Sequence, residues 1–344
     1  MVSVIIPVYN VEQQISKCLN SLLNQTYKNW EGILVNDASL DSSLQICEEY
    51  AKRDSRFIVI RKAKNQGVEY ARYDGMKNVR GRFVTFLDSD DWLDSTMLET
   101  CRNLMEVHKC DIVEMCHRRV MDRFGLVTRR GCGSDAEGLV CLPQLREKYY
   151  VSFFGLNNMA CNLCGKLYRT DLLKKFYPEP VGLTYAEDAY VNLKLFPHVR
   201  SVYFSKEIGY NYRWGGMTSR YNARLMTDQK KYYWLRRAVL EQEDIRHARY
   251  FLDVEAKNVL KSDIRQRLLY QKQDIRLALE EELRDRIWSE VCESLQSQPL
   301  RDIFSALLIS GNAESMIKNV KEDLQRSRIR RFCIRAAAHI LRTL

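Results

Sequence analysis

The chain has 344 residues, with 54 Lys and Arg against 44 Asp and Glu, so its net charge is +10. Hydrophobic residues make up 46% and charged residues 28%, which excludes a disordered or collagen-like chain and suits one large or two ordinary globular domains. No run approaches the roughly 18 apolar residues of a membrane span, and the apolar start lacks a basic leader. We therefore expect a cytoplasmic protein that begins at Met1 and keeps its 11 scattered cysteines reduced.

Glycine and proline divide the chain into two parts. Residues 1–216 hold 14 of the 15 glycines and five of the six prolines. Strands and turns need these residues and long helices exclude them. The first part is therefore predicted to be mixed α/β and the remainder nearly all helix.

Strands and helices are predicted to alternate through the first 90 residues. Apolar patterns predict strands at 2–8, 30–35, 57–60 and 82–87, and helices at 11–23, 42–52 and 68–79. This alternation predicts a mainly parallel sheet that is covered on both faces and binds ligands beyond the carboxyl ends of its strands. Polar residues follow three of those ends, at 9–10, 36–37 and 88–91.

Three carboxylates, Asp88, Asp90 and Asp91, lie within four residues after the fourth predicted strand. Unpaired carboxylates at this density repel one another, and a Mg²⁺ or Mn²⁺ ion, which prefers oxygen ligands, relieves that repulsion. The alternative is an acidic turn that caps the next helix through Asp94 or Ser95. The position after a buried strand, beside two other polar strand ends, favours the metal.

Asp37 ends the second predicted strand, where dinucleotide-binding folds place an acid on a ribose hydroxyl. Those folds need a G-x-G-x-x-G turn after the first strand, and residues 7–12 contain no glycine, which argues against a nicotinamide dehydrogenase. Tyr9 could instead stack on a base that donates a hydrogen bond to Asp37. The alternatives are a core aromatic for Tyr9 and an Asx-turn or helix cap for Asp37.

Together these motifs resemble the family 2 glycosyltransferases, nucleotide-sugar enzymes of the GT-A fold. The resemblance is carried by VIIPVYN (4–10), VNDAS (35–39), NQG with AR (65–67, 71–72) and FLDSDD (86–91). It continues more weakly to about residue 220. GKLYR (165–169) is similar to the family's Asn-Lys-Leu segment but has Gly165 in place of the Asn. YAED (185–188) is similar to the family's Glu-Asp acceptor motif. Residues 212–219 are similar to its late loop over the donor, but they lack the His that many relatives place there.

The resemblance implies an inverting transfer of a sugar from a nucleotide-diphospho-sugar, most simply UDP-linked, to a hydroxyl of a glycan or lipid-linked acceptor in bacterial surface polysaccharide synthesis. Asp188 would be the catalytic base, with Glu187 beside it, because the attacking hydroxyl must lose a proton. Asp90, with Asp88, would hold a Mn²⁺ or Mg²⁺ ion against the departing diphosphate. The residues implied at the donor are Pro7, Tyr9, Asn10, Asp37, Asn65, Gly67, Arg72, Asp88, Lys166 and Arg213. The plainer reading of 187–188 is an acidic first helical turn.

The implied domains are a GT-A catalytic domain at 1–220, with a nucleotide-sugar half (1–100) and an acceptor half (101–220), and a helical region at 221–325. That region is either a packing layer or an oligomerisation module. Residues 326–344 form a predicted basic amphipathic helix with six Arg and no acid, which suits an anionic membrane surface, or a helix docked on the protein.

Other classes of function are weighed against this one. Because 326–344 carries +6 of the +10, the remaining 325 residues carry only +4, and no nucleic-acid recognition motif accompanies them. A nucleotidyltransferase acting on sugar phosphates would also pair an α/β sheet with an aspartate-bound cation. The Cys161-x-x-Cys164 pair lacks two further ligands at paired spacing, which argues against zinc.

Overall fold

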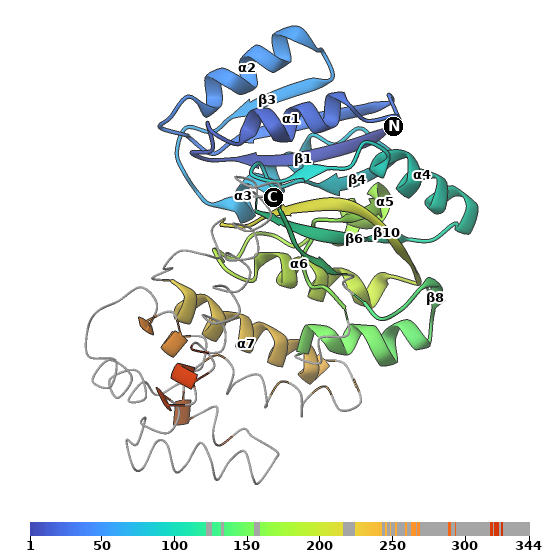
Figure 1. Ribbon diagram of the computed structural model, residues 1–344. Coiled ribbons are helices and arrows are strands. Elements are labelled where there is room, and N and C mark those ends of the chain that lie inside the picture. The colour runs from blue at the N-terminus through green and yellow to red at the C-terminus, as the bar shows by residue number, and fades with distance from the viewer. Residues whose placement is uncertain are drawn as a thin grey trace, which may run out of the picture. The chain divides into compact units, whose positions relative to one another are not determined.

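The structure, a computed structural model, describes residues 1–121, 126–131, 134–154, 159–215 and 224–242, with isolated positions between 245 and 325. The chain separates into two compact units. The first comprises Met1–Phe153 and Asn157–Trp214, and the second Phe154–Leu156 and Gly215–Leu344. The second unit contains α7 (Leu225–Gln242), labelled in Figure 1. Among the residues described, no helix is long and apolar enough to cross a membrane.

Ten strands of the first unit form one sheet. They are β1 (Val2–Val8), β2 (Trp30–Asn36), β3 (Phe57–Arg61), β4 (Phe83–Phe86), β5 (Trp92–Leu93), β6 (Ile112–Met121), β7 (Leu126–Gly131), β8 (Gly138–Cys141), β9 (Lys166–Arg169) and β10 (Ser201–Arg213). The main path is β3-β2-β1-β4-β9-β6-β10-β5, with β7 beside β6 and β8 beside β10. β3, β2, β1 and β4 pair in parallel, which confirms the mainly parallel sheet predicted for this part.

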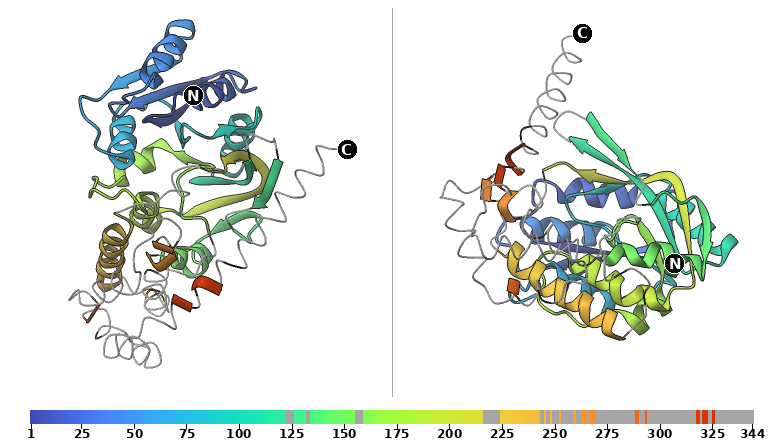
Figure 2. Two further views of the ribbon diagram at one scale, coloured as in Figure 1. Left: turned by 60° about the vertical axis from the view of Figure 1, so that its left-hand side comes forward. Right: turned by 90° about the horizontal axis from the view of Figure 1, so that it is seen from below.

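Helices cover both faces of the sheet, as Figure 2 shows from two further sides. They are α1 (Ile15–Leu23), α2 (Ser43–Arg53), α3 (Val68–Lys77), α4 (Met97–His108), α5 (Thr170–Phe176) and α6 (Glu187–Leu195), with a π-helical turn at Leu145–Tyr149 and 3-10 turns at Tyr150–Phe154 and Phe196–His198. In β2, Gly32 faces Leu22 of α1 whereas Val35 faces Gly75 of α3. Successive side chains of a strand alternate between faces, so α1 and α3 lie on opposite sides of the sheet.

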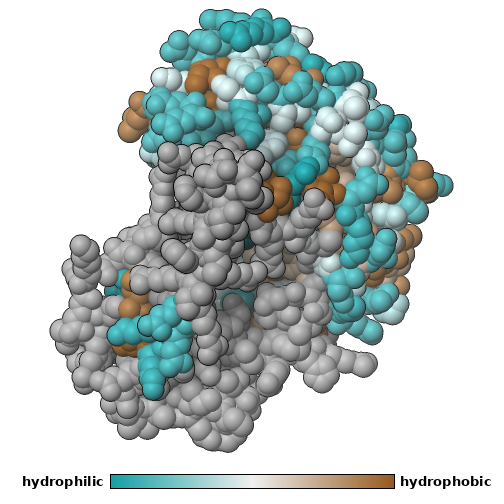
Figure 3. Space-filling model, viewed as in Figure 1, coloured by the Kyte–Doolittle hydropathy of each residue, from teal (hydrophilic) through white to brown (hydrophobic). Residues whose placement is uncertain are grey.

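The strands are buried because both faces are covered. Every residue of β1 is buried, and all but Ser3 are apolar, as expected for a central parallel strand. Ser3 keeps its hydroxyl satisfied by donating to Glu31 at 2.5 Å, and Glu31 also accepts from the backbone N–H of Arg80. On the face seen in Figure 3, hydrophobic residues of the described surface lie in small groups among hydrophilic ones.

Strand directions bring the functional ends together. β9 is antiparallel to both β4 and β6, so β6 runs in the direction of β4, and β10 pairs with β6 in parallel. The carboxyl ends of β1, β2, β4 and β10 therefore lie at one edge of the sheet. Tyr9, Asp37, Asp88 and Arg213 come to this edge from four different strands, three of them as the alternation predicted.

β7, which follows β6 in the chain, pairs antiparallel with it.

The described cysteines differ in their oxidation state. Buried thiols include Cys18, Cys47 and Cys101, which are free. The expectation of reduced cysteines is wrong for Cys116 of β6, which is disulfide-bonded, because spacing alone does not show which thiols a fold brings together. No cluster of three or more metal-binding side chains includes the Cys161-x-x-Cys164 pair or any other described residue.

Gly75 lets α3 lie close against β1 and β2. A Cβ at this position would be 2.6 Å from Cγ2 of Ile5 and 3.3 Å from Cγ2 of Val35, both buried in the sheet. We predict that Gly75→Ala lowers the free energy of unfolding by about 1–2 kcal/mol, because overpacking outweighs the gain in helix propensity. Urea denaturation would measure this change, with Lys77→Ala at an exposed site of the same helix as control. Unchanged stability of Gly75→Ala would contradict the close packing.

Candidate active site

The loops after β1 and β2 are joined to each other at the carboxyl edge. Asn10, in a left-handed conformation (φ 50°), accepts a hydrogen bond from Leu40 N–H at 2.8 Å and donates its own N–H to Ser39 Oγ at 3.2 Å. The N–H of Val11 donates to Ser43 Oγ at 2.8 Å. Tyr9 is 43% exposed beside this joint, so the core-aromatic alternative for Tyr9 is wrong. Pro7 lies inside β1, opposite Val35.

Asp37 organises the loop that begins α3. Its carboxylate accepts hydrogen bonds from the N–H groups of Gln66 (3.1 Å) and Gly67 (2.7 Å) and pairs with Lys62 Nζ at 3.1 Å. Gly67 has a φ of +96°, a conformation that favours glycine, and it directly precedes α3. The nearby Asn65 is exposed. Asp37 thus holds the loop before α3 in place, and its contact with a base stays a prediction.

The acidic loop after β4 is tied to β10. Asp91 is buried and accepts hydrogen bonds from Tyr210 Oη and from the N–H of Arg213, both at 2.7 Å. Tyr210 Oη in turn accepts from the N–H of Asp88 at 3.3 Å. Burial, together with the charges of Asp88 and Asp90, raises the pKa of Asp91 well above its usual range. The buried Asp91 thus has a higher affinity for a proton than an ordinary aspartate.

The helix-cap alternative for this loop is wrong. α4 begins at Met97, after Thr96, and no side chain caps it by a hydrogen bond. The Asp94 carboxylate instead pairs with Arg118 and accepts from Nδ2 of Asn211 at 2.8 Å. Asp94 thereby joins the end of β5 to β6 and β10.

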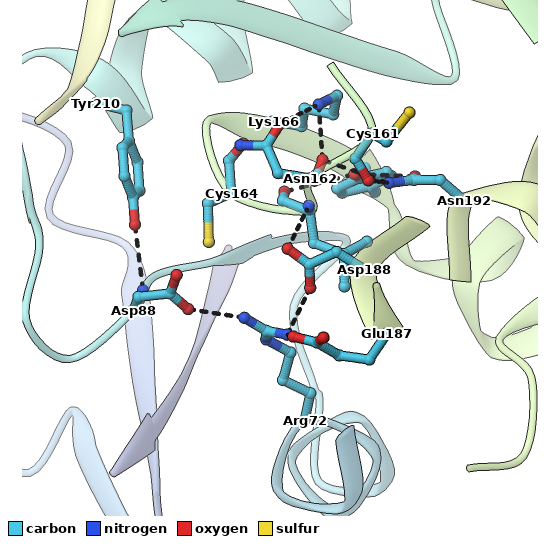
Figure 4. Close-up of polar contacts among 12 residues, drawn as sticks. Arg72, Asp88, Cys161, Asn162, Cys164, Lys166, Glu187, Asp188, Asn192 and Tyr210 are labelled. Carbon is cyan, nitrogen blue, oxygen red and sulfur yellow. Dashed lines mark hydrogen bonds and ion pairs between the residues drawn. The ribbon is translucent and has the colours of Figure 1, made fainter. Parts of the chain in front are cut away.

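Arg72 occupies the centre of the site (Figure 4). Its side chain extends from α3, is 3% exposed, and makes ion pairs on both sides. One terminal nitrogen, Nη2, lies 2.8 Å from Asp88, while Nη1 lies 2.9 Å from Glu187 and 2.5 Å from Asp188. Its Nε has no hydrogen-bond partner among the residues that the structure describes. One guanidinium therefore joins the acidic loop to the first turn of α6, and the predicted contact of Arg72 with a donor stays a prediction.

The three carboxylates around Arg72 outnumber its single charge. Burial, followed by the charge of Asp188, raises the pKa of Glu187 to about 8. Burial also raises the pKa of Asp188, but Arg72, the N–H of Leu163 and the charge of Lys166 act in the opposite direction. The carboxylates in turn raise the pKa of Arg72 well above its usual range, so the guanidinium stays charged. The site thus holds two neighbouring acids with different proton affinities.

Lys166 has other partners than the donor phosphates. It is 1% exposed, lies 3.4 Å from Glu114, and donates to the carbonyl oxygens of Ala160 (3.1 Å) and Asn162 (2.7 Å). Nδ2 of Asn192 also donates to this loop, at the carbonyl oxygen of Cys161. These contacts, drawn in Figure 4, fix the loop whose next N–H, that of Leu163, donates to Asp188 at 3.2 Å. The expectation that Lys166 faces the donor is corrected: a charge this deep serves Asp188 through the backbone.

Several residues of the site were not picked out from the sequence. Tyr210 joins the acidic loop to β10 through Asp91, Lys62 supports Asp37, and Glu69 contacts the segment before α6. Tyr210 and Glu69 lie within a strand and a helix, where polar residues are common and carry no motif signal. Arg213, at the end of β10, contributes its N–H to Asp91, whereas the late loop 216–219 lies outside the described residues.

This geometry can be compared with known proteins. The chain is similar to glycosyltransferase GlyA of Streptococcus pneumoniae (32% identity), over 62% of this chain but only 30% of GlyA, so it spans less than a third of that relative. It is also similar to putative glycosyltransferase EpsH of Bacillus subtilis (30% identity), over 76% of this chain and 75% of EpsH. The crystal structure of S. aureus TarS 1-349 in complex with UDP-GlcNAc matches with a TM-score of 0.66 and 21% identity, over 95% of this chain and 92% of that chain.

The fold and the family follow from these matches. The likeness to TarS confirms the mixed α/β GT-A fold that the strand order and the motifs predicted. The family model for glycosyl transferase family 2 matches residues 3–176, which include the loops after β1, β2 and β4. With this match and the alignment over most of EpsH, the chain belongs to glycosyl transferase family 2.

Proposed function

We propose that this protein is an inverting glycosyltransferase that moves a sugar from a UDP-sugar to a hydroxyl group of a glycan or lipid-linked acceptor. The observation that carries the proposal is the placement of Asp188. Its carboxylate is held from one side by Arg72 and from the other by Leu163 N–H, beside the acidic loop at the carboxyl edge of the sheet. A carboxylate in that position can take the proton of an acceptor hydroxyl while the diphosphate leaves toward the acidic loop.

Glu187 and Asp188, the two acids at the start of α6, would have different roles in this reaction. Glu187, with a pKa raised to about 8, keeps its proton at neutral pH and does not compete with Asp188 for Arg72 as a second full charge. Asp188 has the additional support of a backbone N–H and the nearby Lys166, so its anion is the better stabilised of the two. Asp188 is therefore the base, and Glu187 a neutral neighbour in the acceptor pocket.

A divalent cation fits the loop after β4. Burial raises the pKa of Asp91, the charges of Asp88 and Asp90 add to the shift, and a Mg²⁺ or Mn²⁺ ion, which prefers oxygen ligands, would relieve the repulsion among these carboxylates. Asp90 and Asp88 would hold the ion, which when bound neutralises charge on the diphosphate. Arg72, whose Nε lacks a partner, contributes positive charge from the other side of Asp88. Tyr9, Asn10 and the Asp37 loop would receive the nucleotide.

The proposal also includes the place in the cell where the reaction occurs. A lipid-linked acceptor for a surface polysaccharide would be glycosylated at the cytoplasmic face of the cell membrane. The basic segment 326–344, which lies outside the described residues, carries six Arg and no acid and would bind anionic lipid there.

We predict separate effects for the two proposed functions of the acids. Asp188→Asn loses sugar transfer by about 10²- to 10⁴-fold because the base is gone, with UDP affinity within about twofold of the unsubstituted protein. Asp90→Asn instead weakens Mn²⁺-dependent UDP binding. UDP release from a panel of UDP-sugars, with and without Mn²⁺, and calorimetry with UDP measure these effects.

Asp171→Asn, at an exposed acid of α5, serves as the control for removal of a carboxylate. Full transfer by both Asp188→Asn and Asp90→Asn would show that the site is assigned wrongly. Release of pyrophosphate in place of UDP would instead indicate a nucleotidyltransferase.

The raised pKa of Glu187 also predicts how the free energy of unfolding depends on pH. Its folded pKa of about 8 exceeds the unfolded value near 4.3, so its stabilising contribution is complete below about pH 4 and is lost as the pH rises through 8. Glu187→Gln, which mimics the protonated acid, should be more stable than the unsubstituted protein at pH 9 by at least about 1 kcal/mol, with little difference at pH 5. Urea denaturation at both pH values tests this, with Glu106→Gln at an exposed site as control, and an equal effect at pH 5 and pH 9 would refute it.

The membrane proposal has its own test. Full-length protein should float with liposomes that contain anionic lipid, whereas a chain ending at residue 325 should float less, because it lacks six positive charges. Flotation at low and high salt measures the electrostatic part. Equal flotation of both chains would remove the segment from the proposal.

A further inference from the structure

The segment between α5 and α6 has no regular structure of its own. It runs from Tyr177 to Ala186 and leads directly into Glu187 and Asp188. Gly182 and Ala186 have positive φ angles of 79° and 66°, so the backbone turns sharply twice. Buried backbone N–H groups in such a segment need hydrogen-bond partners from elsewhere in the fold.

Glu69, in the first turn of α3, supplies those partners. Its carboxylate is buried and accepts three backbone hydrogen bonds: from Val181 N–H at 3.0 Å, Gly182 N–H at 2.7 Å and Leu183 N–H at 2.8 Å. Three successive N–H groups bound to one carboxylate hold this part of the segment against α3. Hydrogen bonds to a charged acceptor are also stronger than those between neutral groups.

The same face of α3 holds the segment at two further points. Glu69, Arg72 and Tyr73 are spaced i, i+3 and i+4, which places them on one side of a helix. The Tyr73 hydroxyl donates to Glu179, and Arg72 pairs with Glu187 and Asp188. α3 therefore contacts the beginning, the middle and the end of the stretch 179–188. Its first turn also follows Gly67, whose N–H is bound to Asp37 on the donor side.

We infer that Glu69 is a positioning residue for the acceptor side of the reaction, which it serves through the amides of 181–183. By holding those amides, Glu69 sets the path of the chain into α6 and hence the place of the Asp188 carboxylate. It touches neither the acidic loop nor the loops after β1 and β2 in any hydrogen bond described above. Loss of Glu69 should therefore harm transfer without harming nucleotide binding. This inference rests on the proposed function, because that function names the reaction that Glu69 would serve. The hydrogen bonds between Glu69 and the amides of 181–183 do not depend on it.

Glu69→Gln tests the inference with little change in shape. Its amide group would face at least one of three N–H donors and lose that hydrogen bond. The control is Glu31→Gln, because Glu31 is equally buried and accepts from Ser3 and Arg80, but lies at the amino end of β2, away from the site. A milder second variant, Tyr73→Phe, removes only the hydrogen bond to Glu179.

Three measurements follow the variants: hydrogen–deuterium exchange of 177–186, UDP affinity with Mn²⁺, and hydrolysis of UDP-GlcNAc with water as acceptor. Glu69→Gln should raise exchange at 181–183 by about tenfold or more, since a local contact is lost. It should lower kcat of hydrolysis by about tenfold to a hundredfold through misplacement of Asp188, with donor KM and UDP affinity within about twofold. Tyr73→Phe should raise exchange near 179 only, and Glu31→Gln should change none of these.

Unchanged exchange at 181–183, an equal effect of Glu31→Gln, or a loss of UDP affinity that matches the loss of kcat would each overturn the inference. If the unsubstituted protein neither binds UDP nor hydrolyses UDP-GlcNAc, the proposed function fails instead. Exchange at 181–183 would still decide in that case whether Glu69 holds the segment.

Discussion

The ion pairs of the buried Arg72 guanidinium are the interaction on which the rest of the site depends. They join Asp88, at the end of β4, to Glu187 and Asp188 in α6, which lie about a hundred residues later in the chain. Desolvating three carboxylates without a cation would be very costly, and one guanidinium offsets only part of that cost. Burial and the charge of Asp188 accordingly raise the pKa of Glu187.

α3 is the element that makes this arrangement possible. Gly75 brings the helix close to β1 and β2, Asp37 binds the amides before its first turn, and the buried Arg72 extends from its middle into the site. A helix packed on the central strands moves little relative to the sheet. Side chains carried on such a rigid element hold a reacting geometry better than side chains on a loop. The acceptor segment, irregular in itself, gains its order from this helix through Glu69.

Lys166 illustrates how a residue can matter for a reaction without touching a substrate. A lysine close to an acidic site suggests a contact with phosphate, yet its amine lies inside the fold and binds the carbonyl groups of 160 and 162. The N–H of Leu163 then reaches Asp188. The hydrogen bond from Leu163 to Asp188 is thus set by a buried charge, that of Lys166, which is paired with Glu114.

The alternation of strands and helices, the sheet edge at which polar groups gather, and the family can all be read from the amino-acid sequence, because hydrophobic periodicity and short motifs are local properties of the chain. The motifs also identify Asp88, Asp90, Glu187 and Asp188 as candidates. The packing of the fold was needed to show that Arg72 joins Asp88 to Glu187 and Asp188, that Lys166 faces inward, and that Glu69 holds the amides of 181–183. Those are contacts between residues far apart in the chain, and the direction of a side chain and its degree of burial depend on what packs around it.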